Sequence, residues 1–168
     1  DEPIAELCRK LGVACFRGSE DDVLSRYLLA ADANRADAVV RIASDCPVID
    51  PHVVDSVIRS YVDHRHEYDY VSNIGYRTFP RGMDTEVISA EALYEAYEEA
   101  YTIADREHVT RYIYMNPDRF RLHNVRYVRD ESRHRWTVDM PEDLELIRRI
   151  IEELYPVNAD FTLEDMLE

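Results

Sequence analysis

Two aspartates of this 168-residue chain stand where a cation-binding carboxylate is expected in an α/β protein. Asp45 follows the apolar segment 36–43 and Asp139 follows the shorter segment 135–138, and a proline stands two residues after each aspartate. In open α/β sheets, ligands bind at the carboxyl ends of strands, where a carboxylate can hold a hard cation such as Mg²⁺ that bridges to phosphates. The pair therefore predicts a divalent-cation site. The alternative is that each aspartate only caps the turn that follows it.

Charged residues inside two predicted strands raise a second question. Arg41 lies within the apolar segment before Asp45, where a cation is costly unless it has a partner. It either reaches a ligand at the end of the strand or pairs with a neighbouring acid. Asp84 and Glu86 share one face of a strand predicted at Met83–Ile88, because alternate residues of a strand point the same way. They could accept hydroxyl groups of a sugar, or form the solvated face of an edge strand.

Two further segments contain residue types that can do chemistry. Arg106 and His108 lie in the first turn of a helix predicted at Arg106–Tyr114, where the helix dipole disfavours positive charge, and this mismatch indicates a ligand. The alternative is a solvated Arg106 and a packed His108. Cys46 stands beside Asp45, but neither a neighbouring histidine nor a helix N-terminus activates its thiol. We therefore expect Cys46 to be a packed thiol.

The elements around Asp45 predict how it is positioned. The strand Ala38–Ala43 is almost wholly apolar, which is typical of a strand covered on both faces in a parallel sheet. Asp50 as N-cap and Pro51 at the first helical position predict a helix over Pro51–His64. A strand at Tyr68–Ser72 follows. This alternation of strands and helices predicts a doubly wound α/β sheet.

Periodicity and capping residues predict the remaining elements. The predicted helices are Ile4–Leu11, Glu20–Asn34, Ala90–Tyr101, Pro141–Leu154 and Leu163–Leu167, the last capped by Thr162. The predicted strands are Val13–Phe16, Phe120–Tyr127 and Arg135–Val138, besides those given above.

Composition limits the classes of partner and the compartment. The formal net charge of −15 disfavours binding to nucleic acid or to an anionic membrane surface. No apolar run is long enough to span a membrane. The three cysteines, Cys8, Cys15 and Cys46, are an odd number without metal-ligand spacing, which favours reduced thiols and a cytoplasmic location.

Five motifs in order resemble one known family. The sequence is similar to the spore-coat-polysaccharide branch of the acylneuraminate cytidylyltransferase family over essentially its whole length, whereas any one motif alone would be a weak signal. The motifs are Val-Val-Arg-Ile followed by Asp45-Cys46-Pro47, Tyr70-Val71-Ser72-Asn73, Pro80-x-Gly82-x-Asp84-x-Glu86-Val87, Arg106-Glu107-His108-Val109-Thr110 and Arg135-Trp136-Thr137-Val138-Asp139.

The resemblance implies a fold, a reaction and a set of site residues. It implies a three-layer, Rossmann-like nucleotidyltransferase sheet that is mostly parallel. The hydroxyl of a nonulosonic-type sugar acid would attack the α-phosphate of CTP, giving a CMP-sugar and pyrophosphate with Mg²⁺ as cofactor. The implied metal-binding and catalytic residues are Asp45 and Asp139, and those at the nucleotide are Arg41 and Ser44. The implied sugar-side residues are Ser72, Asn73, Gly82, Asp84, Glu86, Arg106 and His108.

The resemblance also implies an organisation and two departures from the family pattern. We expect one domain over residues 1–168, in which residues 74–132 form an insertion that helps to build a homodimer. Ser44 stands where the family usually has glycine, and the family's first strand and nucleotide loop are expected before Asp1. Two alternatives remain open: a noncatalytic dimerisation module of the same fold, and a metal-dependent glycosyltransferase. A second aspartate two residues after Asp45 would favour the glycosyltransferase, but that position is Pro47.

Overall fold

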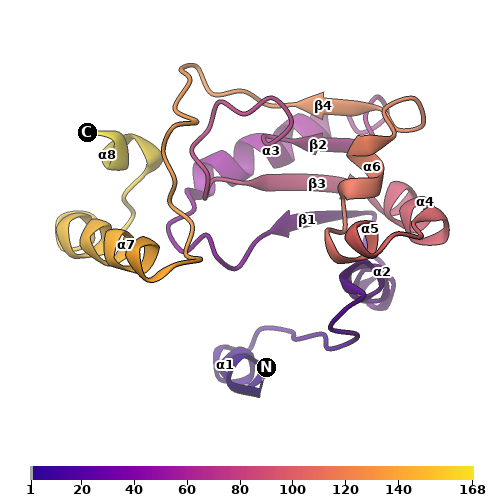
Figure 1. The fold of residues 1–168 in the computed structure, drawn as a ribbon, viewed down its shortest axis with the longest axis horizontal. Helices are drawn as coiled ribbons and strands as arrows, with labels where there is room; N and C mark the ends of the chain where they lie inside the picture. The colour runs from indigo at the N-terminus through magenta and orange to yellow at the C-terminus, as the bar shows by residue number, and fades with distance from the viewer. Residues whose placement is uncertain (1) are drawn as a thin grey trace.

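A four-stranded mixed sheet forms the centre of the computed structural model, which describes residues 2–168 (Figure 1). Asp1, the first residue of the predicted domain, lies outside the described residues. Three strands run in the same direction, and β3 runs antiparallel between β1 and β2, so the parallel hydrogen-bonded pair is β2 with β4. The spatial order is β1 (Ala38–Ile42), β3 (Thr85–Ser89), β2 (Tyr70–Ser72) and β4 (Leu122–Asn124).

Helices cover both faces of this sheet, which gives the predicted three-layer α/β architecture (Figure 1). Helix α3 (Pro51–Asp63) packs on one face, where Val71 and Val87 are buried against it. Tyr70 and Ile88 point to the opposite face and belong to a second core cluster. The helices of that second face are α2 (Val23–Asn34), α4 (Ala90–Glu99), α5 (Ile103–Glu107) and α6 (Arg111–Met115).

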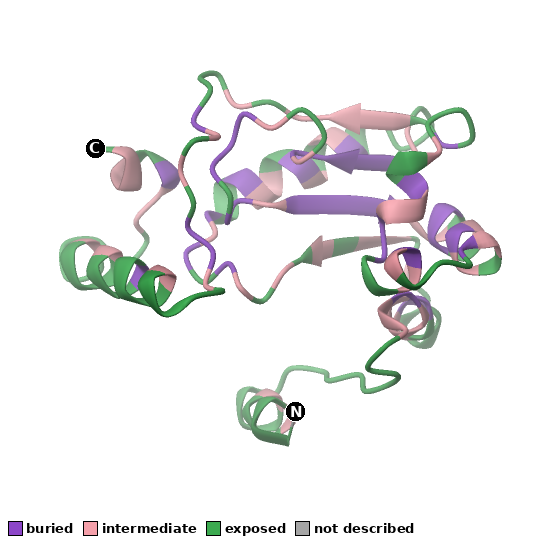
Figure 2. Cartoon of the chain, in the orientation of Figure 1, coloured by how far each residue is buried: buried purple, intermediate pink, exposed green. Residues whose placement is uncertain are grey.

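The C-terminal helices α7 (Pro141–Leu154) and α8 (Leu163–Leu167) lie beyond the carboxyl ends of β1, β2 and β4 (Figure 1). A third core cluster, which includes Met83, Trp136 and Ile147, joins them to the body. Helix α1 (Glu2–Leu11) stands apart and has no buried residue (Figure 2). No helix among the described residues is long and apolar enough to cross a membrane.

Asp50 shows how a local capping signal also fixes tertiary structure. Its Oδ1 accepts a hydrogen bond from the backbone N–H of His52 at 2.7 Å, which starts α3 as predicted. Its Oδ2 accepts the N–H of Leu163 at 2.7 Å. The buried carboxylate therefore satisfies N–H groups at the starts of two helices and holds α8 against α3.

Several predicted elements differ from the structure for tertiary reasons. Residues 13–16 are exposed and form no strand, because no described strand lies beside them to pair with. The helix predicted at Arg106–Tyr114 is broken at Val109, whose φ of 51° separates α5 from α6. The strand predicted at Arg135–Val138 is reduced to one isolated bridge between Arg135 and Arg81.

The prediction that the first apolar strand is covered on both faces is wrong for the described residues. β1 is an edge strand, and its Val40 and Ile42 side chains are 40% and 41% exposed. An apolar run indicates that a strand can be buried. It does not say which elements bury it.

Gly82 gives a direct test of how two loops pack. Its φ is +106°, and a Cβ at this position would lie 2.6 Å from the carbonyl oxygen of Trp136. We expect Gly82→Ala to destabilise the protein by about 1–3 kcal/mol, because both the backbone conformation and the close approach exclude a side chain. Thermal unfolding measures this, with Gly12→Ala as the control: its φ is also positive, but nothing lies within 4 Å of its added Cβ. Equal losses for the two variants would contradict the packing argument.

Candidate active site

The loops that contain Asp45 and Asp139 meet at the carboxyl end of β1. The backbone N–H of Val138 donates a hydrogen bond to the carbonyl oxygen of Asp45 at 2.9 Å. This contact places the two aspartates at the same edge of the sheet, although they are far apart in the sequence. Asp45 is half-buried and Asp139 is exposed.

Arg135 pairs with the Asp139 carboxylate and links it to helix α7. Its Nη2 lies 2.5 Å from Oδ2 of Asp139 and 3.0 Å from Oδ2 of Asp143. Asp143 also accepts the backbone N–H of Asp139 at 3.0 Å. The hydrogen bond from Arg135 and this backbone bond lower the pKa of Asp143 to about 2. Asp143 therefore stays ionised and retains Arg135 beside the loop.

Cys46 reports the electrostatics of the space next to Asp45. Its buried thiol lies 3.6 Å from Oδ1 of Asp45. Burial and, to a lesser extent, the negative charges of Asp45, Asp84 and Asp139 together raise the pKa of Cys46 to about 12. A thiol with such a pKa stays protonated at neutral pH and cannot act as a nucleophile.

The donor chemistry at this edge fits a hard divalent cation. Carboxylate oxygens are the ligands that Mg²⁺ prefers, and Mg²⁺ usually keeps several waters and binds through one or two carboxylates plus phosphates. Asp45 and Asp139 would supply those two carboxylates. Among residues 2–168 no group of three or more His, Cys, Asp or Glu side chains is arranged to hold a metal ion, so a fuller protein cage is not present there.

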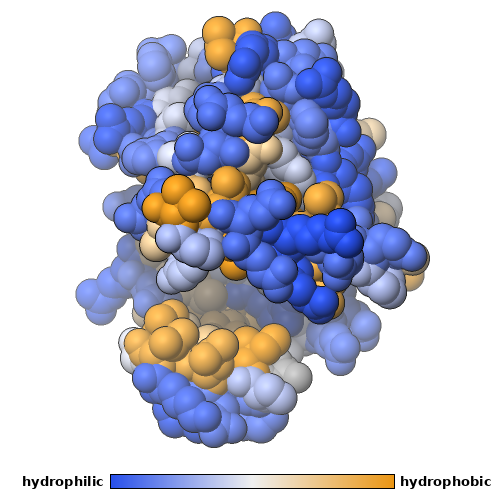
Figure 3. Space-filling view, turned by 90° about the vertical axis from the view of Figure 1, so that its left-hand side faces the viewer, coloured by the Kyte–Doolittle hydropathy of each residue, from blue (hydrophilic) through white to orange (hydrophobic). Residues whose placement is uncertain are grey.

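A cleft of about 620 Å³ opens beside Asp45 toward helix α7. Ser44 and Asp45 form one side, and Leu144, Ile147 and Ile151 of α7 form an apolar side. Figure 3 looks onto this end of the molecule and shows apolar side chains both here and on α1 at the bottom, where they face the body. Ser44 is exposed in this cleft, so its side chain is accessible to a ligand.

Arg41 takes the second of its two predicted alternatives and pairs with an acid. Its guanidinium contacts Glu86 directly across the pair of strands β1 and β3. Glu86 is 1% exposed and also accepts a hydrogen bond from Tyr70 at 2.5 Å. Burial lowers the pKa of Arg41, but the adjacent Glu86 carboxylate outweighs this and raises it above its ordinary value. Ser72 is aligned with Glu86 in β2, so a polar row crosses this face of the sheet.

Two other predicted sugar-side residues make internal contacts. Asn73 is fully buried; its Nδ2 donates to the carbonyl of Met83 at 2.6 Å, and its Oδ1 accepts the N–H of Thr85 at 2.9 Å. Gly82 packs against the backbone of Trp136, as described above. Both residues therefore shape the loop before β3.

Asp84 directly precedes β3 and lies at the carboxyl end of β1, because the adjacent Thr85 pairs with Ile42, whereas Glu86 pairs with Arg41 inside that strand. It forms a two-point ion pair with Arg77, with Nη1–Oδ1 at 2.5 Å and Nη2–Oδ2 at 2.8 Å. The sequence prediction missed Arg77. Its only signal was one arginine in a turn-like segment, and its contact with Asp84 depends on how that turn folds back.

Arg106 lies in helix α5, and His108 caps the C-terminus of that helix. Arg106 donates to Asp22 at 2.5 Å and to the carbonyl of Tyr97 at 2.7 Å, so it ties α5 to α2 and α4. His108 is exposed, which differs from the packed histidine that was one of the predicted alternatives. The contacts of Arg106 with Asp22 and Tyr97 hold it among these helices and do not bring it to Asp45.

A mixed sheet between helical layers, with carboxylates gathered at the carboxyl ends of its strands, defines the class of Rossmann-like nucleotidyltransferase folds. The sequence model of the family described as "Cytidylyltransferase" matches residues 1–163. The chain belongs to the cytidylyltransferase family.

Individual relatives agree with this assignment. The chain is 35% identical over 163 residues to an uncharacterized protein of Methanocaldococcus jannaschii, covering 95% of this chain and 65% of that protein. It is 31% identical over 160 residues to the spore coat polysaccharide biosynthesis protein SpsF of Bacillus subtilis, covering 89% of this chain and 62% of SpsF. The chain thus spans slightly less than two thirds of the length of these curated relatives.

A solved structure shares the whole fold of the chain. A cytidylyltransferase from Leptospira borgpetersenii serovar Hardjo-bovis superposes with a TM-score of 0.94 at 32% identity, over 99% of this chain and 69% of the other. The predicted α/β fold class is therefore confirmed.

Proposed function

We propose that the protein is a Mg²⁺-dependent cytidylyltransferase that activates a sugar acid with CTP for surface polysaccharide biosynthesis. The observation that carries the proposal is the hydrogen bond from Val138 to Asp45, which joins the loops of Asp45 and Asp139 at the carboxyl end of β1 in a chain of this family. The name of the Bacillus subtilis relative, spore coat polysaccharide biosynthesis protein SpsF, supports the polysaccharide context. The sequence motifs that resemble the acylneuraminate cytidylyltransferase family support a sugar acid as acceptor.

The residues of this chain would have distinct roles in the transfer reaction. A sugar hydroxyl forms a bond to the α-phosphorus of CTP, the bond to the β-phosphate oxygen breaks, and pyrophosphate leaves as the hydroxyl proton is lost. Asp45 and Asp139 would hold Mg²⁺, which when bound neutralises charge on the phosphates. Arg135 would turn from Asp139 toward Asp143, which already binds it. The protonated Cys46 offers no competing nucleophile.

We also propose a cytoplasmic homodimer. The region 74–132 exposes large apolar side chains, among them Tyr101 and Ile103, which are 84% and 82% exposed. Burying such side chains in a self-complementary contact would remove apolar surface from water. Sedimentation analysis of the protein measures the oligomeric state.

Pyrophosphate release from CTP tests the reaction and is measured with the protein as its gene encodes it. With CTP, Mg²⁺ and a panel of nonulosonic acids, we expect release that depends on one of the acids and on Mg²⁺. UTP, ATP and GTP serve as controls for the base and should react at least about tenfold more slowly, since a site built to hydrogen-bond one base rejects analogues that leave its polar groups unpaired. Absence of acid-dependent release, or equal release from all four nucleotides, would overturn the proposal.

A further inference from the structure

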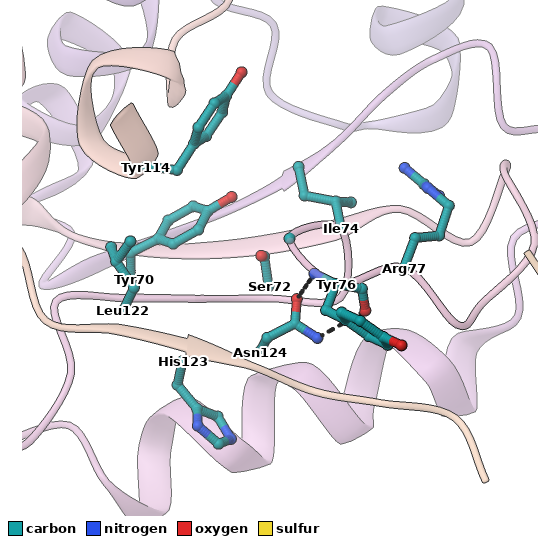
Figure 4. Close-up of a pocket in the computed structure, with 10 residues that line it drawn as sticks. Tyr70, Ser72, Ile74, Tyr76, Arg77, Tyr114, Leu122, His123 and Asn124 are labelled. Atoms are coloured by element: carbon teal, nitrogen blue, oxygen red, sulfur yellow. Dashed lines mark hydrogen bonds between the residues drawn. The ribbon is translucent and has the colours of Figure 1, made fainter. Parts of the chain in front are cut away.

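A pocket of about 590 Å³ lies beside the carboxyl ends of β2 and β4 (Figure 4). Tyr114 reaches it from α6, while Tyr70, Ser72 and Arg77 reach it from β2 and the turn after it. Tyr76 and Asn124 complete the polar part of the lining.

Two polar side chains of the lining, Asn124 and Tyr70, are already held by other parts of the protein. Asn124 accepts the N–H of Tyr76 at 2.9 Å and donates to the carbonyls of Tyr76 and Val125 at 3.1 Å each. Tyr70 donates to Glu86 at 2.5 Å. These bonds fix the shape of the pocket and occupy the groups that would otherwise bind a ligand. A pocket of this kind recognises its ligand mainly by shape and by the few polar groups that remain free to bind it.

Among the described residues that line the pocket, Arg77 is the one with a permanent charge. Its two-point contact with Asp84 uses two of the five N–H donors of a guanidinium, and its side chain is 21% exposed. The hydrogen bond that Arg77 donates to the Asp84 carboxylate raises the pKa of Arg77, so the charge is retained at every accessible pH. A guanidinium fixed in this way presents its remaining donors in a set direction and suits a carboxylate.

The rest of the wall is apolar. Ile74, Leu122 and the rings of Tyr70, Tyr76 and Tyr114 line it. A ligand that fills this space therefore needs an apolar part as well as an anionic group. An acylated sugar acid has both.

Arg77 also connects this pocket to the aspartate edge. Asp84, its partner, directly precedes Thr85, and Thr85 pairs with Ile42, the last residue of β1. A molecule in the pocket with its acidic group at Arg77 would therefore reach toward the carboxyl end of β1, from which the Asp45 loop leads.

We propose that Arg77, held in place by Asp84, determines specificity by binding the carboxylate of an acylated sugar acid in this pocket. The inference rests on the proposed function, because it names the residue that selects the acceptor of that reaction. Arg77 is a binding residue here, and Asp84 is its positioning residue.

The inference is tested without CTP by comparing how sugar acids and their methyl esters bind to the protein and to its Arg77 variants. Binding of N-acetylneuraminic acid and of its methyl ester is measured by NMR titration of the full protein, and 3-deoxy-manno-octulosonic acid and its methyl ester form a second pair. We expect at least one acid to bind about tenfold more tightly than its ester, as charge-assisted hydrogen bonds to a guanidinium imply. Arg77→Gln should bring that ratio close to one, Arg77→Lys should retain part of it, and Asp84→Asn should reduce it.

Arg59→Gln is the matched control, because Arg59 is 75% exposed on α3 and pairs with Asp55 on the surface. It should leave the ratio unchanged, and thermal unfolding of every variant shows whether each one is folded. The inference is overturned if neither acid is preferred over its ester, or if a folded Arg77→Gln protein keeps the preference. If pyrophosphate release occurs but the ratio does not depend on Arg77, the inference fails and the proposed function stands. If the ratio depends on Arg77 but no nucleotide reacts, the proposed function fails instead.

Discussion

Replacing Asp45 by asparagine should slow CTP-dependent pyrophosphate release by about 10²–10³-fold. The metal is expected to supply several kcal/mol of stabilisation to the phosphates in the transition state, and each 1.36 kcal/mol corresponds to about tenfold in rate. Asparagine preserves the size of the side chain and removes the negative charge that a hard cation requires. The initial rate of pyrophosphate release is measured at saturating CTP and Mg²⁺ with the protein as its gene encodes it.

A second readout separates metal binding from catalysis. Binding of Mn²⁺, followed by electron paramagnetic resonance, should weaken by at least about tenfold in Asp45→Asn, since even outer partners of metal ligands cost that much when changed. Asp118→Asn is the control, because Asp118 is exposed in the turn before β4 and lies outside the lining of the cleft beside Asp45. Unchanged rate and unchanged Mn²⁺ binding in a folded Asp45→Asn protein would show that the metal assignment is wrong.

Local signals in the sequence were sufficient for the helices that carry strong caps. Helix α7 begins at Pro141 and ends at Leu154 as predicted, and α8 begins after Thr162 as predicted. The starts of these two helices depend on side chains within three residues of the first helical residue, so no tertiary information is needed to predict them. The strand-end position of Asp45 was predictable for a similar reason, because an apolar run followed by an acidic turn is local.

Features that depend on strand order were not predictable from one sequence. The antiparallel β3 lies between β1 and β2, and only this arrangement sets Arg41 opposite Glu86. The signal was present as two opposite charges within apolar strands, but their pairing requires the register. The pocket at β4 escaped prediction for the same reason, since its lining joins residues 70–77 to Tyr114 and to residues 122–124. Arg77 escaped prediction because its contact with Asp84 depends on how the turn between them folds back.

The buried pair of Arg41 and Glu86 leads to the largest expected loss of stability. We expect Glu86→Ala to reduce the free energy of unfolding by about 3–5 kcal/mol, because it leaves the half-buried guanidinium of Arg41 without its counter-charge. The hydroxyl of Tyr70 would lose its acceptor at the same time, and an unsatisfied buried donor adds to the cost. Urea denaturation at constant pH measures the change, with the exposed Glu67→Ala as the control.

A double variant identifies the cause of that loss. If the cost comes from an unpaired charge, Arg41→Leu combined with Glu86→Leu should recover most of it, since a buried ion pair and apolar residues of similar volume are often equally stable. The interaction free energy from the double-mutant cycle should then be favourable by more than about 1 kcal/mol. A loss below about 1 kcal/mol in Glu86→Ala, or additive losses in the cycle, would mean that the polar row across the sheet does not stabilise the fold through this pair. In that case the charge at Arg41 would have to serve a ligand at the end of β1, which was the first of its two predicted alternatives.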